Sequence, residues 1–120
     1  MVDDDPAMCR TLSRLLKGHG FHASLFQEGH QALAQLRRGV PYPDALVVDI
    51  HIPDLSGLKI MRALTGEGVR IPTLAISGLF ESLSAEQMSR LGCNDFLEKP
   101  FKSEQFMERI RLLLIEDTRR

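Results

Sequence analysis

The sequence has no tryptophan, a single tyrosine and only two cysteines in 120 residues. Cys9 and Cys93 lie far apart and match no metal-binding spacing, so we expect two reduced cysteines rather than a disulfide or a zinc site. No apolar run approaches the length that spans a membrane, and we expect no signal peptide before the acidic start. Together these absences predict a cytoplasmic protein without a membrane anchor.

The chain also lacks an excess of charge of either sign. It has 15 basic and 16 acidic residues, for a net charge of −1. Domains that bind nucleic acid usually carry a clear basic excess, so we expect no direct contact with DNA or RNA. With 43% hydrophobic residues and no internal repeat or low-complexity segment, the sequence predicts one domain over residues 1–120.

Helical and extended patterns alternate along the chain. Pro6 suits the first position of a helix, and Asp5 before it suits the N-cap. Helices are predicted where apolar residues recur every three or four positions: residues 6–17, 31–38, 57–66, 81–91 and 102–115. Strands are predicted at the short apolar runs between them: residues 21–26, 45–48, 72–76 and 96–97.

This alternation predicts an α/β fold whose parallel strands are joined by right-handed crossovers, with helices on both faces of the sheet. Polar residues follow the strands where each one ends: Asp3, Asp4, Asp49, Ser77 and Lys99. In open α/β sheets the ligand site lies outside the carboxyl ends of the strands. We therefore expect these five side chains to meet at one edge of the sheet.

Such an edge suits phosphoryl transfer. Two carboxylates 4 Å apart repel by about 4 kcal/mol at an effective dielectric near 20, and a hard divalent ion such as Mg²⁺ relieves this. Lys99 and Ser77 supply a positive charge and a hydroxyl donor for phosphoryl oxygens. A carboxylate such as Asp49 can act as the nucleophile and form an aspartyl phosphate.

Along essentially its whole length the sequence resembles the receiver domains of bacterial two-component response regulators. The family's acidic pair matches Asp3 and Asp4, and its phosphoacceptor motif matches VVDIHIPDLSG, with Asp49 as the acceptor. Its hydroxyl residue matches Ser77 in LAISG, and its lysine-proline pair matches Lys99 in DFLEKPF. The resemblance implies a flavodoxin-like, doubly wound, five-stranded parallel sheet in the order 2-1-3-4-5.

The resemblance also implies roles for these residues. Asp49 would take a phosphoryl group from a phosphohistidine on a sensor kinase or phosphotransfer protein, and Lys99 would pair with a phosphoryl oxygen. Asp4 and Asp49 would bind Mg²⁺ directly, together with the backbone carbonyl of His51. Asp3 would act through a metal-bound water.

Ser77 and Phe96 would form the switch that responds to phosphorylation. Their movement would change the face made by the fourth helix, the fifth strand and the fifth helix. That face would control an output domain C-terminal to this chain or another partner, and it leaves a homodimer open. His51 borders the path of the hydrolytic water in the family, so we hypothesise that it sets the phosphoryl lifetime.

One departure from the family lies before the acidic pair. Receivers normally have several apolar residues there, forming a central strand, whereas only Met1 and Val2 precede the pair here. We expect an unusually short first strand, with lowered stability or unusual association.

Two other function classes compete with a phosphorylatable receiver. A pseudo-receiver would act as a phosphorylation-independent interaction module, and the short first strand favours it by threatening the placement of Asp3 and Asp4. An aspartyl-nucleophile phosphatase needs an aspartate two residues after the nucleophile, where this chain has His51, so that class fits poorly. The self-phosphorylating chemistry leaves the label of enzyme open.

Overall fold

Helices and strands alternate along the described part of the computed structural model, which comprises residues 1–3, 5–38, 43–49, 57–68, 71–77, 86 and 92–118. The helices are α1 (Pro6–Gly18), α2 (Gly29–Arg37), α3 (Gly57–Gly66) and α5 (Ser103–Thr118). The strands are β1 (Leu46–Asp49), β2 (Thr73–Ser77) and β3 (Asp95–Glu98). Each lies within a few residues of a predicted element. The helix predicted over residues 81–91 lies outside the described residues except at Glu86, which is helical.

The three strands pair in parallel in the order β1-β2-β3. Val2 extends this sheet by single bridges to Val48 on one side and to Phe26 on the other. The Val2 amide donates to the Val47 carbonyl at 2.7 Å, and the Phe26 amide donates to the Met1 carbonyl at 2.9 Å. With Val2 as the first strand and Phe26 as the second, the spatial order is 2-1-3-4-5. The predicted fold class and the short first strand are confirmed.

The predicted strand over residues 21–26 is wrong in extent, because only Phe26 pairs. A ladder extends only as far as the neighbouring strand supplies residues to pair with, and within residues 1–3 that neighbour contributes a single bridged residue, Val2. The rest of the segment stays outside the sheet, with His22, Ser24 and Leu25 exposed.

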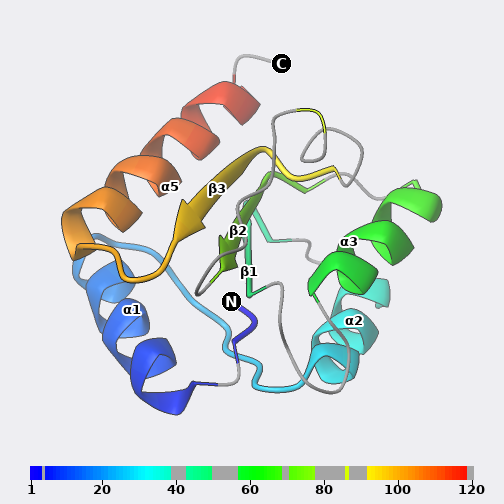
Figure 1. Cartoon of the computed structure of the whole chain (residues 1–120), viewed down its shortest axis with the longest axis horizontal. Coiled ribbons are helices and arrows are strands. Elements are labelled where there is room, and N and C mark those ends of the chain that lie inside the picture. The colour runs from blue at the N-terminus through cyan, green and yellow to red at the C-terminus, as the bar shows by residue number, and fades with distance from the viewer. Residues whose placement is uncertain are drawn as a thin grey trace.

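Helices cover both faces of the sheet, so the strands are apolar on both sides. Figure 1 shows α1 and α5 on one side and α2 and α3 on the other. Leu46 and Val48 of β1 pack with α2 and α3, whereas Val47 between them packs with α1 and α5. All positions of β1 and β2 are buried, as expected for a parallel sheet between two helical layers.

The third aspartate of the opening run caps α1. The Asp5 carboxylate accepts hydrogen bonds from the amides of Ala7 at 3.0 Å and Met8 at 3.2 Å, and Pro6 occupies the first turn. The predicted cap is confirmed, and it directs the chain away from the sheet immediately after Asp3. No helix within the described ranges is long and apolar enough to cross a membrane.

Candidate functional site

The carboxyl ends of the parallel strands bring four predicted site residues to one edge of the sheet. Asp3 follows Val2, Asp49 ends β1, Ser77 ends β2 and Lys99 follows β3. Backbone hydrogen bonds between neighbouring strands fix the positions of these residues along the strand direction. The Asp49 amide donates to the Val2 carbonyl at 2.8 Å, and the Lys99 amide donates to the Ser77 carbonyl at 2.6 Å. The positions of the side chains along this edge are therefore set by the sheet itself.

The Lys99 ammonium forms hydrogen bonds with the carboxyl groups of both Asp3 and Asp49. Its Nζ donates to Asp3 Oδ2 at 3.1 Å and to Asp49 Oδ2 at 3.0 Å. The side chains of Asp3 and Asp49 are 1% and 7% exposed, and that of Lys99 is 21% exposed. Two nearly buried acids thus share one cation, and the other oxygen of Asp3 accepts the Asp5 amide at 2.9 Å.

Burial and charge act in opposite directions on these groups. Burial raises the pKa of Asp3, although hydrogen bonds from the Asp5 amide and Lys99 partly offset the rise. For Lys99, burial alone would lower the pKa, but the hydrogen bond to Asp49 and the charge of Asp3 outweigh it, and the pKa is raised. Lys99 is therefore charged at neutral pH. One ammonium group therefore contacts two carboxyl groups at this edge.

Carboxylate oxygens are donors that Mg²⁺ prefers. Asp3 and Asp49 therefore fit the predicted metal. Asp4 and His51, the other two predicted ligands, lie outside the described residues. Within the described ranges no group of three acidic, histidine or cysteine side chains is arranged to hold a metal ion.

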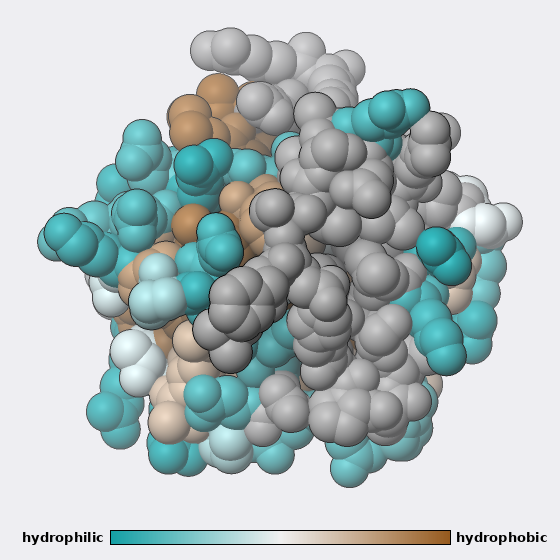
Figure 2. All heavy atoms as spheres, viewed as in Figure 1, coloured by the Kyte–Doolittle hydropathy of each residue, from teal (hydrophilic) through white to brown (hydrophobic). Residues whose placement is uncertain are grey.

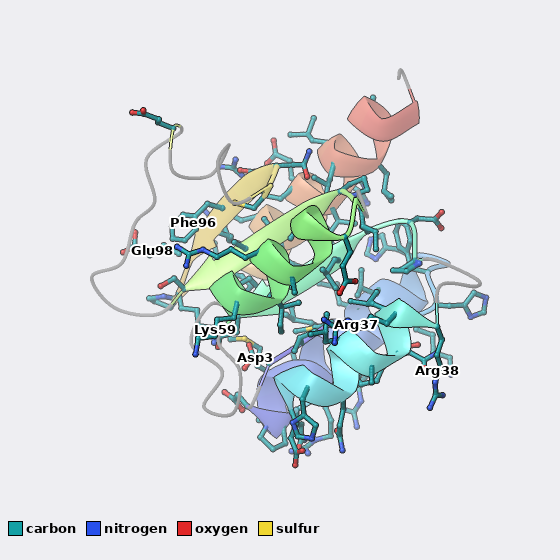
Figure 3. All side chains as sticks on the ribbon, turned by 90° about the vertical axis from the view of Figure 1, so that its right-hand side faces the viewer. Asp3, Arg37, Arg38, Lys59, Phe96 and Glu98 are labelled. Atoms are coloured by element: carbon teal, nitrogen blue, oxygen red, sulfur yellow. The ribbon has the colours of Figure 1, made fainter. Side chains whose placement is uncertain are left out.

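Ser77 and Phe96 occupy neighbouring strands. Ser77 is fully buried, and its backbone carbonyl accepts the Lys99 amide. Phe96 lies opposite Ala75 in β2 and is partly exposed. In Figure 3, Phe96 and Glu98 project from the same side of β3, and Asp3 lies at the end of the sheet where β3 finishes.

Two supporting contacts were not predicted from the sequence. Cys9 is 2% exposed, and its thiol donates to the Asp3 carbonyl at 3.4 Å, so the first turns of α1 pack beneath the acidic residue. Burial raises the pKa of this thiol, which keeps it protonated. Its place on the buried face of α1, beside Leu12 and Leu16, was the available signal.

The second contact connects Phe96 to α5. Asp95 Oδ1 accepts the Phe96 amide at 2.8 Å, and both Asp95 oxygens accept Arg109 Nη1 at 3.1 Å. An acidic residue on β3 and a basic residue on α5 are too far apart in sequence for local spacing to reveal the pair.

Comparisons with known proteins agree on one family. Residues 1–111 match the model of the response regulator receiver domain. Response regulator MprA of Mycobacterium leprae is 39% identical over 115 residues, covering 94% of this chain and 49% of that protein. MprA of Mycolicibacterium vanbaalenii is 37% identical over 120 residues, covering 98% and 50%. The chain thus spans about half the length of the curated relatives it matches.

Solved structures show the same fold. The Francisella response regulator 1452 receiver domain superposes with a TM-score of 0.86 at 22% identity, covering 97% of this chain and 94% of that one. The receiver domain of NtrX from Brucella abortus gives a TM-score of 0.83 at 25% identity, with 94% of each chain covered.

We expect the Asp3 carboxyl group to titrate above its ordinary pKa of 3.8 in the folded protein, as measured by carbon-detected NMR in magnesium-free buffer. Because its pKa is higher in the folded state, that state keeps the proton above pH 3.8. The contribution of Asp3 to the free energy of unfolding therefore falls as the pH rises through the interval up to the folded pKa. A titration at or below 3.8 would contradict this.

Lys99→Met removes the ammonium that lowers the pKa of Asp3, so that pKa should rise further in the variant. Lys102→Met is the matched control, since Lys102 is exposed and makes no side-chain contact with Asp3. An Asp3 pKa that falls in Lys99→Met, or that shifts equally in the control, would show that Lys99 does not act on Asp3.

Proposed function

Because this chain belongs to the response regulator receiver domain family of two-component systems, we propose that Asp49 accepts a phosphoryl group from a phosphohistidine. The donor is a sensor histidine kinase or a phosphotransfer protein. The observation that carries the proposal is the partly buried Lys99 ammonium, 3.0 Å from Asp49 and 3.1 Å from Asp3. A carboxylate beside an ammonium group is the combination that a nucleophile for phosphoryl transfer needs, which supports the proposal.

The chain's own groups can perform the transfer as follows. An Asp49 carboxylate oxygen attacks phosphorus, the bond from phosphorus to the histidine nitrogen breaks, and the imidazole leaves with the electron pair. Lys99 would neutralise charge on the phosphoryl oxygens. Its hydrogen bond to Asp49 and the charge of Asp3 raise the pKa of Lys99 and favour its protonated form. Little covalent chemistry is asked of the protein beyond positioning and charge compensation.

Asp3 and Asp49 offer oxygen donors to Mg²⁺, and we assign Asp4 and the backbone carbonyl of His51 to the same ion. Asp3 would act on it through water. Bound there, Mg²⁺ would neutralise the phosphoryl oxygens and the excess negative charge of the acids.

The response to phosphorylation would pass through Ser77 and Phe96 to the face made by residues 81–91, β3 and α5. The Asp95–Arg109 pair ties β3 to α5 beside Phe96, so a change at Phe96 can reach α5. Figure 2 shows hydrophobic side chains over the second half of α5, where Leu112 and Ile115 are each 48% exposed. This surface suits a C-terminal output domain or a second copy of the chain.

The alternative of a phosphorylation-independent interaction module is less well supported. Burying Asp3, Asp49 and Lys99 together costs desolvation energy, and a module that only docks partners gains nothing from it. The bridges of Val2 to Phe26 and Val48 are followed directly by Asp3, which contacts Lys99. The concern raised by the short strand therefore does not extend to Asp3.

Incubation with acetyl phosphate and Mg²⁺ should add one phosphoryl group, detected by intact mass. Asp49→Asn should abolish the adduct because it removes the nucleophilic carboxylate, and chelation of Mg²⁺ should suppress it. Asp44→Asn, which alters an exposed aspartate, is the control and should be labelled normally. An adduct that persists in Asp49→Asn, or none on the wild-type protein, would refute the proposal. Rapid consumption of many equivalents would indicate a phosphatase.

In receiver domains the side chain two residues after the acceptor borders the path of the hydrolytic water, so His51→Ala should change the half-life of the phosphoryl group on Asp49. The decay is followed by intact mass after removal of acetyl phosphate. His30→Ala, an exposed histidine in α2, is the control. Equal half-lives for wild type and His51→Ala would show that His51 does not set the lifetime of the phosphoryl group.

A further inference from the structure

A short segment joins the first strand to α1 and carries the predicted acidic pair. Val2 is the one bridged residue within residues 1–3, and α1 begins at Pro6. One bridged residue anchors this segment at its start but does not restrict the backbone beyond it. The positions of the acidic residues therefore also depend on contacts with α1.

Cys9, in the first turns of α1, makes two such contacts. Its backbone amide donates to the Asp5 carbonyl at 3.0 Å, and its thiol donates to the Asp3 carbonyl at 3.4 Å. The thiol is shielded from solvent, because Cys9 is only 2% exposed. One residue of α1 thus holds the carbonyl groups at both ends of the segment from Asp3 to Asp5.

The Asp3 carbonyl needs this thiol as a donor. Asp3 is buried, and within the described part of the chain no group other than the Cys9 thiol donates a hydrogen bond to its carbonyl. A buried carbonyl that loses its donor destabilises the folded state. A cysteine packs like a small apolar residue and still offers an S–H donor, so it suits a position on the buried side of α1 that also faces a carbonyl.

The Asp3 carbonyl belongs to the peptide unit that connects Asp3 to Asp4. A peptide unit is planar, so the direction of its carbonyl group also sets the direction of the amide of the next residue. A hydrogen bond to this carbonyl therefore restricts the backbone at both acidic residues. One of them is the residue proposed to act through water, and the other is the residue proposed to bind Mg²⁺ directly.

We propose that Cys9 is a positioning residue for Mg²⁺ binding: its thiol orients the peptide unit between Asp3 and Asp4, so that the acidic pair is arranged before the ion binds. This inference rests on the proposed function of Asp49 and its magnesium ion. Cys9 acts through the Asp3 carbonyl and contributes no ligand. Because linkage is reciprocal, Mg²⁺ bound to the acidic pair should in turn stabilise the packing of Cys9.

Two other roles fit Cys9 less well. A redox-sensing cysteine is solvent-accessible, whereas Cys9 is buried. A direct ligand of Mg²⁺ would be an oxygen atom, and the Cys9 thiol already donates to a backbone carbonyl. A third role, packing alone, would not require a hydrogen-bond donor, and comparison of variants with and without a donor tests it.

The first experiment compares Cys9→Ala, which removes the donor, with Cys9→Ser, which keeps one. Isothermal titration calorimetry gives the Mg²⁺ affinity without any phosphoryl donor. Cys9→Ala should bind Mg²⁺ at least about threefold more weakly, since loss of a residue that orients metal ligands typically costs about 10–100-fold and a thiol is a weak donor. Cys9→Ser should stay within about twofold of wild type. Cys93→Ala, which removes the other buried thiol, is the matched control and should bind as wild type does.

The second experiment uses the wild-type protein, so it does not depend on whether a variant folds. N-ethylmaleimide labels a buried thiol only when the structure around it opens, and peptide mass spectrometry gives the rate for each cysteine separately. Mg²⁺ should slow the labelling of Cys9 by a larger factor than that of Cys93. Cys93 precedes β3 and makes no hydrogen bond to the acidic residues, so it reports the general stabilisation by the ion.

Three results would overturn the proposal. The first is a Mg²⁺ affinity of Cys9→Ala equal to that of wild type, or no Mg²⁺ binding by wild type. The second is an equal loss in Cys9→Ser and Cys9→Ala, which would mean that the sulfur acts by packing alone. The third is equal slowing of labelling at both cysteines. Failure of acetyl phosphate to label Asp49 in wild type would instead refute the proposed function, because neither experiment on Cys9 uses a phosphoryl donor.

Discussion

The rest of the site depends on one ammonium group held between two carboxylates. Lys99 lies 3.1 Å from Asp3 and 3.0 Å from Asp49, and the two acids are almost completely buried. Without the cation, two like charges would occupy a poorly solvated edge and repel each other. With it, both carboxyl groups have a positively charged hydrogen-bond donor, and the proposed nucleophile already lies beside the charge that a phosphoryl group would need.

The sheet makes this arrangement possible. The three residues come from positions 3, 49 and 99 of the chain, and only parallel pairing brings the ends of their strands together. Val2 is central to this, because its single residue bridges Phe26 and Val48 and holds Asp3 beside β1. Asp5 then starts α1, whose Cys9 supports the Asp3 carbonyl from below. The hydrogen bonds that hold the first strand and α1 in the fold therefore also position the site residues.

Much of the fold could be predicted because its signals are local. The spacing of apolar residues predicted α1 and α5, and continuous apolar runs predicted β1 and β2. Asp5 followed by Pro6 predicted the N-cap of α1. The strand over residues 21–26 could not be judged locally, since its pairing depends on how many residues the neighbouring strand contributes. The candidate residues followed from their places at strand ends, given parallel pairing.

The finer features of the site lie beyond sequence spacing. Lys99 contacts both acids because its side chain extends from the end of β3 toward Asp49 and Asp3. Nothing near Lys99 in the sequence indicates these contacts. The Asp95–Arg109 ion pair and the hydrogen bond from Cys9 to the Asp3 carbonyl likewise depend on how α5 and α1 pack against the sheet.

The most direct test of the central claim is a double-mutant cycle of unfolding free energies in magnesium-free urea titrations, using Lys99→Met, Asp3→Asn and both together. Lys99→Met should destabilise the protein by about 3 kcal/mol, because it leaves buried carboxylates without their cation. Asp3→Asn should recover part of that loss in the Lys99→Met background, so the two effects should not add. Additive effects, or a Lys99→Met variant as stable as wild type, would contradict the claim that Lys99 holds the acids together.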